Sequence, residues 1–308
     1  MASLEKKQDI MFFIFMSSFW ALNYPLVKLA LDYEDSFTLL LYRVIFSLIG
    51  IIIIFNRRLI LKIGLISHIK MLILSFLNVF IFMELWFIGE SSVSSSLSSI
   101  LIYTYPIIST LLSIMLLHEK YTRETIAGII LGFSGIMVIF SNSLGLNSYY
   151  GIILEIMAAV SWSSGTIFYK RFIRTEDRIS TNFYQFAYSL IPIFLITLIY
   201  GNYGEMLHPN VYFILLSAII GIPGTAIAYY LFLKLNRDYN VSTVSSFLFL
   251  VPAISVFFGF FLLKETLSSI QIVGFALVSM GIVFSSRGSR NKGKNLPDNL
   301  SGNIQSLN

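Results

Sequence analysis

The sequence contains no cysteine, which excludes disulfide bonds, thiolate zinc sites and cysteine nucleophiles. Proline is rare, with only 7 residues, so the chain is neither collagen-like nor a proline-rich disordered segment. Charged residues are scarce as well. They make up 12% of the 308 residues, whereas an ordinary soluble domain has about 25%. The low charge excludes a soluble globular protein.

Catalytic motifs are also missing, since no H-E-x-x-H, G-x-S-x-G or G-x-x-x-x-G-K-[ST] pattern occurs. His68, His118 and His208 fall in loops or at segment ends, and no aspartate falls inside an apolar segment. An intramembrane enzyme needs catalytic groups at depth, and a primary pump needs a nucleotide-binding loop. We therefore expect no enzyme activity, no catalytic residue, no cofactor and no metal site.

Apolar residues, in contrast, make up 56% of the chain. A helix that spans a bilayer needs about 20 of them in a row, and the apolar blocks are too long and continuous for the strands of an outer-membrane barrel. The sequence predicts an all-α membrane protein with ten transmembrane helices. Their expected ranges are about 10–31, 36–55, 70–89, 93–117, 124–141, 149–171, 180–200, 210–233, 241–263 and 268–286.

The basic residues indicate the orientation of these helices. If the N-terminus is cytoplasmic, all of the 21 lysines and arginines except Lys28, Arg43 and Lys264 fall in cytoplasmic segments. The positive-inside rule then predicts a multi-pass protein of the cell membrane with both termini in the cytoplasm. The net charge of +5 is explained by this topology, so no nucleic-acid partner is expected.

The chain also repeats itself. The matched positions are Trp20, Lys28 and Arg43 with Trp162, Lys170 and Gln185 at a shift of 142, and Pro106, Glu119, Gly128 and Gly135 with Pro252, Glu265, Gly274 and Gly281 at a shift of 146. Each repeat holds five predicted spans, and because five is odd the second repeat enters the membrane in the opposite orientation. Inverted repeats are typical of secondary transporters. We expect a first repeat at 1–145, a second, inverted repeat at 146–286 and a disordered cytoplasmic tail at 287–308.

Through these matched residues, the chain between about 10 and 286 resembles the drug/metabolite transporter superfamily, and within it the EamA family of ten-helix carriers. The resemblance implies a substrate cavity between the two halves, lined mainly by helices 1–4 and 6–9, with helices 5 and 10 as packing supports. Members move amino acids, nucleotide sugars, sugar phosphates and other metabolites, mostly outward in bacteria and archaea. Glu84 occupies a position where the family has a small residue, so a shared binding site cannot simply be transferred to this chain.

Three charged residues lie inside predicted spans, where charge is costly and usually faces a cavity or a partner. Arg43, Glu84 and Glu155 each lie roughly 10 Å below the outer boundary, at about 1.5 Å per helical residue. We expect Arg43 and Glu84 to form a pair in the transport pathway. A purely structural ion pair is the alternative. For Glu155 there are two alternatives, a functional role or a side chain that reaches to the membrane surface. A carboxylate that changes protonation with substrate would make the proton the coupling ion.

Polar and aromatic side chains extend this set. Trp20 and Asn23 share a helix face, and Trp162 repeats Trp20. Gly221 to Gly224 interrupts a span around Pro223, and its repeat counterpart ends at Asn78, so both halves weaken at one level. The expected substrate-binding residues are Trp20, Asn23, Tyr42, Arg43, Asn78, Glu84, Trp162, Tyr184, Gln185 and Tyr188.

Together these features predict a secondary active transporter of small metabolites, an exporter of amino acids or related compounds. It would work by alternating access of two inverted repeats around a central cavity. A channel, a lipid scramblase or a membrane receptor is the alternative. The expected partners are a small-molecule substrate, membrane lipid and a proton as coupling ion, and the protein would be a monomer or a homodimer.

Overall fold

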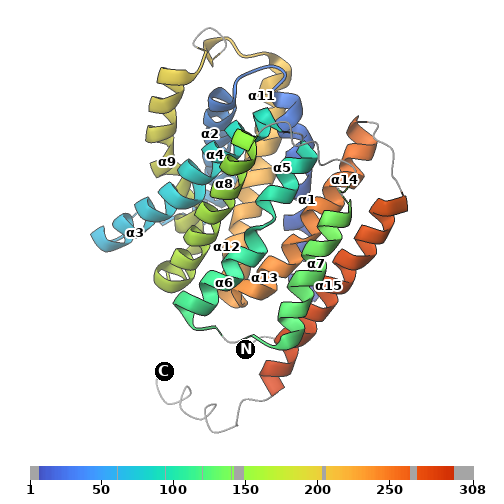
Figure 1. The fold of residues 1–308 in the computed structure, drawn as a ribbon. Coiled ribbons are helices and arrows are strands. Elements are labelled where there is room, and N and C mark those ends of the chain that lie inside the picture. The colour runs from blue at the N-terminus through green and yellow to red at the C-terminus, as the bar shows by residue number, and fades with distance from the viewer. Residues whose placement is uncertain are drawn as a thin grey trace.

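The computed structural model describes residues 7–60, 62–93, 95–119, 121–139, 141, 149–202, 206–263 and 269–294, and this part of the chain is helical, without strands (Figure 1). The α-helices are α1 Lys7–Ala30, α2 Ser36–Phe55, α3 Leu65–Ser75, α4 Phe82–Ser92, α5 Ser95–Ile102, α6 Tyr105–Leu117, α7 Arg123–Ile139, α8 Tyr149–Phe168, α9 Arg178–Tyr200, α11 Val211–Gly221, α12 Ala228–Asp238, α13 Val241–Leu248, α14 Leu250–Leu263 and α15 Ser269–Lys294. Asn56–Arg58 forms the 3-10 helix η1. Three π-helical segments, η2 Phe76–Ile81, η3 Tyr169–Ile173 and η4 Ile222–Ile227, continue α-helices. The predicted all-α class is confirmed for these residues.

Six helical stretches of the described residues are long and apolar enough to cross a membrane. They are Gln8–Ala30, Ser36–Arg58, Leu65–Ser92, Tyr149–Ile173, Arg178–Tyr200 and Val211–Asp238. Three of them fall in each predicted repeat. The remaining apolar helices are shorter, at Tyr105–Leu117, Val241–Ser255 and Ile272–Gly281. The molecule is therefore a multi-pass membrane protein.

Two predicted spans are broken at equivalent positions of the two repeats. The helix expected at 93–117 is divided into α5 and α6, and the one expected at 241–263 into α13 and α14. Proline has no N–H to donate four residues back. Pro106 therefore leaves the carbonyl of Ile102 without its helical donor, and Pro252 does the same at Leu248. Ile102 and Leu248 are the last residues of α5 and α13, so the two prolines explain both breaks.

The segments η2 and η4 also occupy equivalent positions, 146 residues apart. Pro223 near the start of η4 removes a backbone donor, which explains the wider turn there. The segment η2 contains no proline or glycine. Each interruption expected from the sequence is thus a π-helical segment within a continuous stretch, rather than a gap in the helix.

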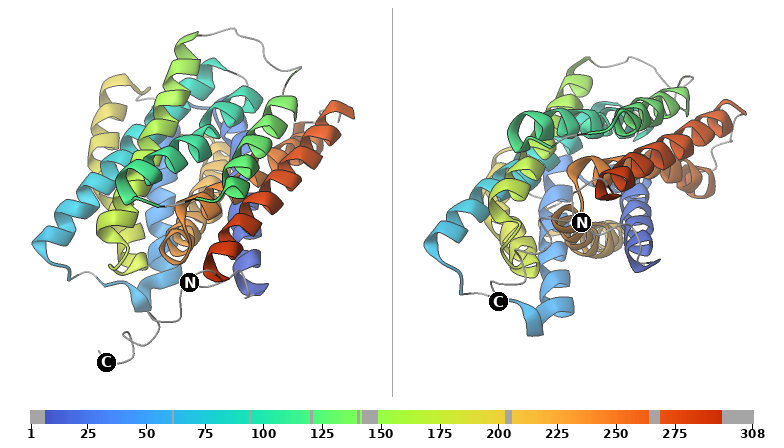
Figure 2. Two further views of the ribbon diagram at one scale, coloured as in Figure 1. Left: turned by 60° about the horizontal axis from the view of Figure 1, so that its bottom comes forward. Right: turned by 90° about the horizontal axis from the view of Figure 1, so that it is seen from below.

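The two repeats interleave. Helix α1 packs against α12 and α14, α2 against α9 and α11, and α4 and α6 against α8. Helices α7 and α15 lie side by side at one edge of the molecule (Figures 1 and 2). Their backbones approach closely, because a Cβ on Gly135 would lie 2.7 Å from the Val278 nitrogen, and one on Gly281 would lie 2.5 Å from the Gly132 nitrogen. Helices α7 and α15 thus pack mainly against each other, while α1, α2, α4, α8 and α12 pack across the centre of the molecule.

Helix α15 continues beyond the last predicted span, through the start of the predicted disordered tail, to Lys294. Basic residues such as Arg287 and Arg290 follow the apolar part of this helix, and cations near a helix C-terminus are favourable. Residues 295–308 lie outside the described residues.

Candidate substrate-binding site

An aromatic cavity lies where the interleaved helices meet. Its lining comes from α1, α2, α4, α8 and α12, together with the end of α5 and the residue after it. The lining residues are Trp20, Asn23, Tyr24, Arg43, Phe82, Trp86, Ile102, Tyr103, Trp162 and Tyr229. All three tryptophans of the protein are among them. The cavity volume is about 20 Å³, which is room for about one water molecule, so a small metabolite does not fit in it in this structure.

Trp162 lies at the centre of the ring cluster. Its ring stacks on Tyr105 at a centroid distance of 4.0 Å and on Phe82 at 5.0 Å. The ring of Trp20 meets it edge-on at 5.3 Å and also contacts Tyr229 at 5.5 Å. The two tryptophans matched by the repeat thus pack directly against each other across the boundary between the repeats.

Arg43 is the only basic residue among the described residues of the lining, and it is 1% exposed. Its Nε donates to the Thr225 hydroxyl at 2.8 Å. Its Cζ lies 4.9 Å from the ring centroid of Trp86 and 5.2 Å from that of Phe87, within the range of cation–π attraction. Nη1 of Arg43 is buried and has no hydrogen-bond partner. The guanidinium group is therefore fixed in position, and its Nη1 can still donate a hydrogen bond.

The expected ion pair between Arg43 and Glu84 is wrong for this structure, because neither Nη1 of Arg43 nor either carboxylate oxygen of Glu84 has a partner. The two residues have similar depth in the membrane, but Arg43 contacts Trp86. A helix turns about 100° per residue, so Glu84 lies about 200° around α4 from Trp86. Glu84 points to another side of its helix.

Two asparagines of the predicted set make equivalent contacts across the repeats. Nδ2 of Asn23 donates to the carbonyl of Gly224 at 3.0 Å, and a Cβ on Gly224 would lie 2.1 Å from Oδ1 of Asn23. Likewise, a Cβ on Gly165 would lie 1.9 Å from Oδ1 of Asn78. In the repeat, Asn23 corresponds to Gly165 and Asn78 to Gly224. We call these two contacts the crossed Asn–Gly pairs.

The other predicted residues lie outside the cavity. The Tyr42 hydroxyl donates to the carbonyl of Met206 at 3.0 Å. Tyr184 and Tyr188 stack on each other at 5.5 Å, and Tyr188 hydrogen-bonds His68. Tyr188 also lines a separate apolar groove of about 500 Å³ between α3, η2 and α9. Nε2 of Gln185 donates to Asn182 at 2.9 Å. The structure therefore gathers only Trp20, Asn23, Arg43 and Trp162 in the central cavity.

Sequence reasoning missed six residues of the lining, namely Tyr24, Phe82, Trp86, Ile102, Tyr103 and Tyr229. Tyr24 follows Trp20 by four residues, so the 3.6-residue period would have placed both on one face of α1. Tyr229 lies just after the interrupted segment. Tyr103 had no such signal, because the break between α5 and α6 sets its position.

Lys28 and Lys170, which are matched by the repeat, cap the C-termini of two helices in the same way. Nζ of Lys28 donates to the carbonyls of Glu90 at 3.2 Å and Val93 at 3.3 Å. Nζ of Lys170 donates to the carbonyl of Asn236 at 2.6 Å and also to that of Tyr239. Unpaired carbonyls at a helix C-terminus favour a cation. Each lysine thus caps the helix that follows a π-helical segment.

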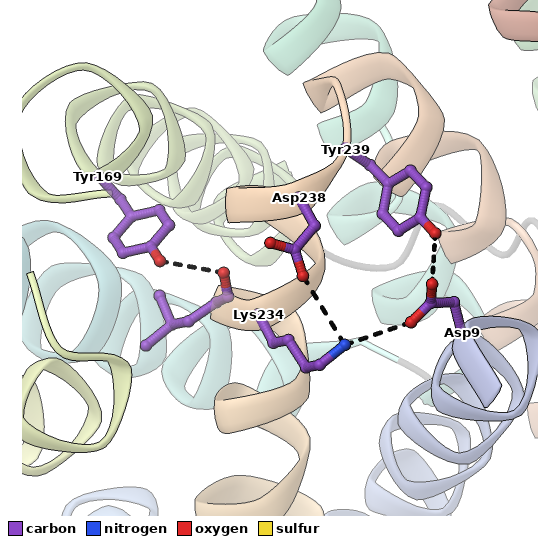
Figure 3. A network of polar contacts seen from close by, with 6 residues as sticks. Asp9, Tyr169, Lys234, Asp238 and Tyr239 are labelled. Carbon is purple, nitrogen blue, oxygen red and sulfur yellow. Dashed lines mark hydrogen bonds and ion pairs between the residues drawn. The ribbon is translucent and has the colours of Figure 1, made fainter. Parts of the chain in front are cut away.

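At the end of the molecule where α1 begins, polar side chains join the two repeats (Figure 3). Nζ of Lys234 lies 3.2 Å from Asp9 and 3.7 Å from Asp238. The Tyr239 hydroxyl donates to Asp9 at 2.7 Å. Burial, the hydrogen bond to Asp9 and the negative charge of Asp9 raise the pKa of Tyr239 above its ordinary value. We call these four residues the α1–α12 network, and it joins the start of α1 to the end of α12.

Comparison with known proteins agrees with this architecture. A protein of Bacillus subtilis (strain 168), the uncharacterized transporter YvbV, is 28% identical over 92% of this chain and 92% of its own length. A probable amino-acid metabolite efflux pump of Escherichia coli (strain K12) is 25% identical over 64% of this chain and 69% of its own. A solved structure titled "Crystal structure of protein" superposes with a TM-score of 0.79 at 15% identity, covering 93% of this chain and 99% of the other.

The family comparison covers nearly the whole chain in two copies. The EamA-like transporter family matches residues 8–141 and, separately, residues 149–287. The protein is thus a transporter rather than an enzyme, and the chain belongs to the EamA-like transporter family.

Proposed function

We propose that the protein is a secondary active transporter that exports small metabolites, namely amino acids or related compounds, across the cell membrane. It would have ten spans with both termini in the cytoplasm and would work by alternating access. Its two repeats would exchange conformations around the aromatic cavity. The observation that carries this proposal is the pair of equivalent π-helical segments, each held by side chains of the other repeat.

These side chains bind backbone carbonyls within the π-helical segments. On η2, the carbonyl of Leu77 accepts from the Ser161 hydroxyl at 2.7 Å, and that of Asn78 accepts from the Tyr229 hydroxyl at 3.3 Å. On the η4 side, the carbonyl of Gly224 accepts from Asn23. Because such bonds can be exchanged more readily than a continuous helical ladder, these segments are suited to bend during transport.

The crossed Asn–Gly pairs support two alternating states. Asn23 is hydrogen-bonded to the carbonyl of Gly224, whereas neither side-chain atom of Asn78 has a hydrogen-bond partner, although Asn78 is 0% exposed. A buried amide without partners is costly. Equivalent residues therefore differ in their bonding, as inverted repeats would in one of two states. In the opposite state, Asn78 would be bonded and Asn23 released.

Two lining residues of the cavity are hydrogen-bonded to the π-helical segments η2 and η4. Thr225 of η4 accepts the hydrogen bond from Arg43, and Tyr229, which bonds the carbonyl of Asn78 in η2, lines the cavity. A substrate that displaces Arg43 or Tyr229 would therefore change the support of a π-helical segment. Binding that differs between two conformations shifts their populations.

We propose the proton as coupling ion, with Glu155 as a candidate carrier. Glu155 is 0% exposed, and neither of its carboxylate oxygens has a hydrogen-bond partner. Its carboxyl group lies against α4, with Cδ 3.0 Å from the position of a Cβ on Gly89. A buried carboxylate without an opposite charge beside it is strongly disfavoured relative to its protonated form, and Glu90, which acts on Glu155, is also acidic. A group that binds a proton in one state can couple the proton gradient to transport.

Counterflow in proteoliposomes tests the proposal. Vesicles preloaded with unlabelled phenylalanine or 3-phenylpropionate should accumulate the labelled compound transiently, because a site that alternates exchanges inner for outer substrate. A channel would let the label equilibrate without an overshoot, and a receptor would admit none. Either result would reject the carrier. An imposed pH gradient should then drive net uptake in wild-type vesicles and not in Glu155→Gln vesicles.

A further inference from the structure

We propose that the aromatic cavity takes a small organic monoanion, with Arg43 binding its carboxylate and the aromatic rings holding its apolar body. This inference rests on the proposed function, because it names the substrate class of the same site. It is carried by three features of the lining: a buried cation with a free donor, aromatic walls, and the lack of an acidic side chain.

The cation is already positioned. One hydrogen bond to Thr225 and two aromatic rings fix the Arg43 guanidinium, while Nη1 has no partner. A buried charge is costly unless an opposite charge and hydrogen bonds compensate it. A carboxylate matches the planar donor geometry of a guanidinium. Glu90 acts on Arg43 from outside the lining, and no described lining residue supplies an anion directly, so an anionic ligand would bring that charge into contact with Nη1.

The rest of the lining suits an apolar, planar body. Trp20, Trp86, Trp162 and Phe82 contribute rings, and Tyr24, Tyr103 and Tyr229 add rings with hydroxyl groups. Aromatic pairs at 4.5–7 Å between centroids are favourable beyond the area they bury. A ligand ring would replace some of these contacts with similar ones. Because the cavity volume is only about 20 Å³, binding must also displace the tryptophan rings.

The charge of the lining separates a monoanion from a zwitterion. Among the described residues, no aspartate or glutamate lines the cavity. Glu90 acts electrostatically on Arg43 and Tyr24, but it does not belong to the lining. An ammonium group would have only ring faces as partners. We therefore expect a carboxylate without an ammonium group to bind better than the corresponding amino acid, and an amine alone to bind worst.

Three probes with the same phenyl body test this order on the purified full-length protein: 3-phenylpropionate, phenylalanine and phenethylamine. All tryptophans line the cavity, so intrinsic fluorescence reports directly on it. Fluorescence titrations should give a saturable change with 3-phenylpropionate, a dissociation constant about tenfold or more higher for phenylalanine, and no saturation with phenethylamine. Bound ligand should also raise the melting temperature.

Variants identify the carboxylate partner. Arg43→Gln should weaken 3-phenylpropionate binding about tenfold or more, and Arg43→Lys should weaken it less because it keeps the charge. The matched control is Arg171→Gln, since Arg171 also stacks on a ring, with its Cζ 5.5 Å from the Phe172 centroid, but lies outside the cavity. This control should bind like the wild type.

Several outcomes would overturn the inference without touching the carrier. They are tight phenethylamine binding, phenylalanine binding at least as tight as 3-phenylpropionate, or unchanged 3-phenylpropionate binding in a folded Arg43→Gln variant. If Arg43→Gln fails to fold, the order of the three probes on the wild-type protein decides. Carboxylate binding without counterflow would instead reject the carrier and leave the ligand class standing.

Discussion

Trp162 joins rings of the cavity to rings behind it, since it contacts the lining residues Trp20, Phe82 and Tyr103 and also Tyr105 and Phe232, which lie outside the lining. Its side chain is 2% exposed. Its removal should therefore affect both the packing of these rings and the wall on which a ligand body rests.

We predict that Trp162→Ala weakens 3-phenylpropionate binding by about 1–3 kcal/mol, the value of burying a large apolar side chain. It should also lower the melting temperature, because the stack on Tyr105 is lost. Calorimetric titration and thermal unfolding measure the two effects. Phe172→Ala is the control, since Phe172 is 46% exposed and should change neither. A variant that melts earlier yet binds normally would make Trp162 a packing residue only.

The two capping lysines permit a second prediction. Lys28→Met and Lys170→Met should each lower the free energy of unfolding by about 1–2 kcal/mol, because two helix-terminal carbonyls lose a charged donor. Denaturant unfolding in detergent measures the loss. Lys62→Met, at an exposed position, should have no effect. Equal stability of all three variants would show that water replaces the lysines at no cost.

For single residues, the sequence predicts which side chains matter better than it predicts which way they point. The repeat identifies Trp20 and Trp162, which do meet in the cavity. Depth in the membrane alone pairs Arg43 with Glu84, but depth does not fix where a side chain points around its helix. Tyr103 could not be found, because its place depends on a helix break caused by Pro106, three residues later.

At the scale of elements, the π-helical segments have different origins. Pro223 explains η4, but η2 has no proline, so its wider turn depends on partners from other helices, such as Ser161 and Tyr229. Sequence comparison of the two repeats locates η2 correctly because Asn78 corresponds to Gly224. It cannot reveal the hydrogen bonds that hold η2, since these depend on the packing of the second repeat against the first.

The crossed Asn–Gly pairs lead to opposite effects for two equivalent substitutions. Asn23→Ala removes a bond made in this state and should favour the opposite state. Asn78→Ala removes an amide that is unsatisfied here, so it should favour this state. A single cysteine at Tyr239, part of the α1–α12 network, should react faster with a thiol reagent in the first variant and more slowly in the second.

The control for these two variants is Asn182→Ala. Asn182 donates to the carbonyl of Ala226 at 2.8 Å, and both residues belong to the second repeat, so this variant should lose stability without changing the labelling rate. A shift in the same direction for Asn23→Ala and Asn78→Ala would show that the two pairs do not alternate. The cysteine at position 239 removes one donor of the network, so all rates are compared within that background.

At the scale of the whole molecule, the two halves of the chain share features that no single helix explains. The breaks after Ile102 and Leu248, the segments η2 and η4 and the two lysine caps occur at positions 146 residues apart or matched by the repeat. Apolar run length is sufficient to predict the helical class, whereas the inverted orientation of the second half stays a prediction. The interleaving of the halves was not predictable from these signals, because it depends on the contacts of α1 and α2 with the second repeat.

Topology is the last prediction, and the absence of cysteine makes it directly testable. The basic residues place Asn56 and Arg174 in the cytoplasm and Asn202 outside. Asn202 follows α9, whereas Asn56 and Arg174 follow α2 and η3. A cysteine at position 202 should react with a membrane-impermeant thiol reagent in intact cells, and cysteines at 56 and 174 should react only after permeabilisation. The same permeabilised cells control for accessibility, because a position that stays unlabelled there is buried rather than cytoplasmic. The reverse pattern would invert the whole molecule in the membrane, and the α1–α12 network would then lie at the outer end instead of the inner one.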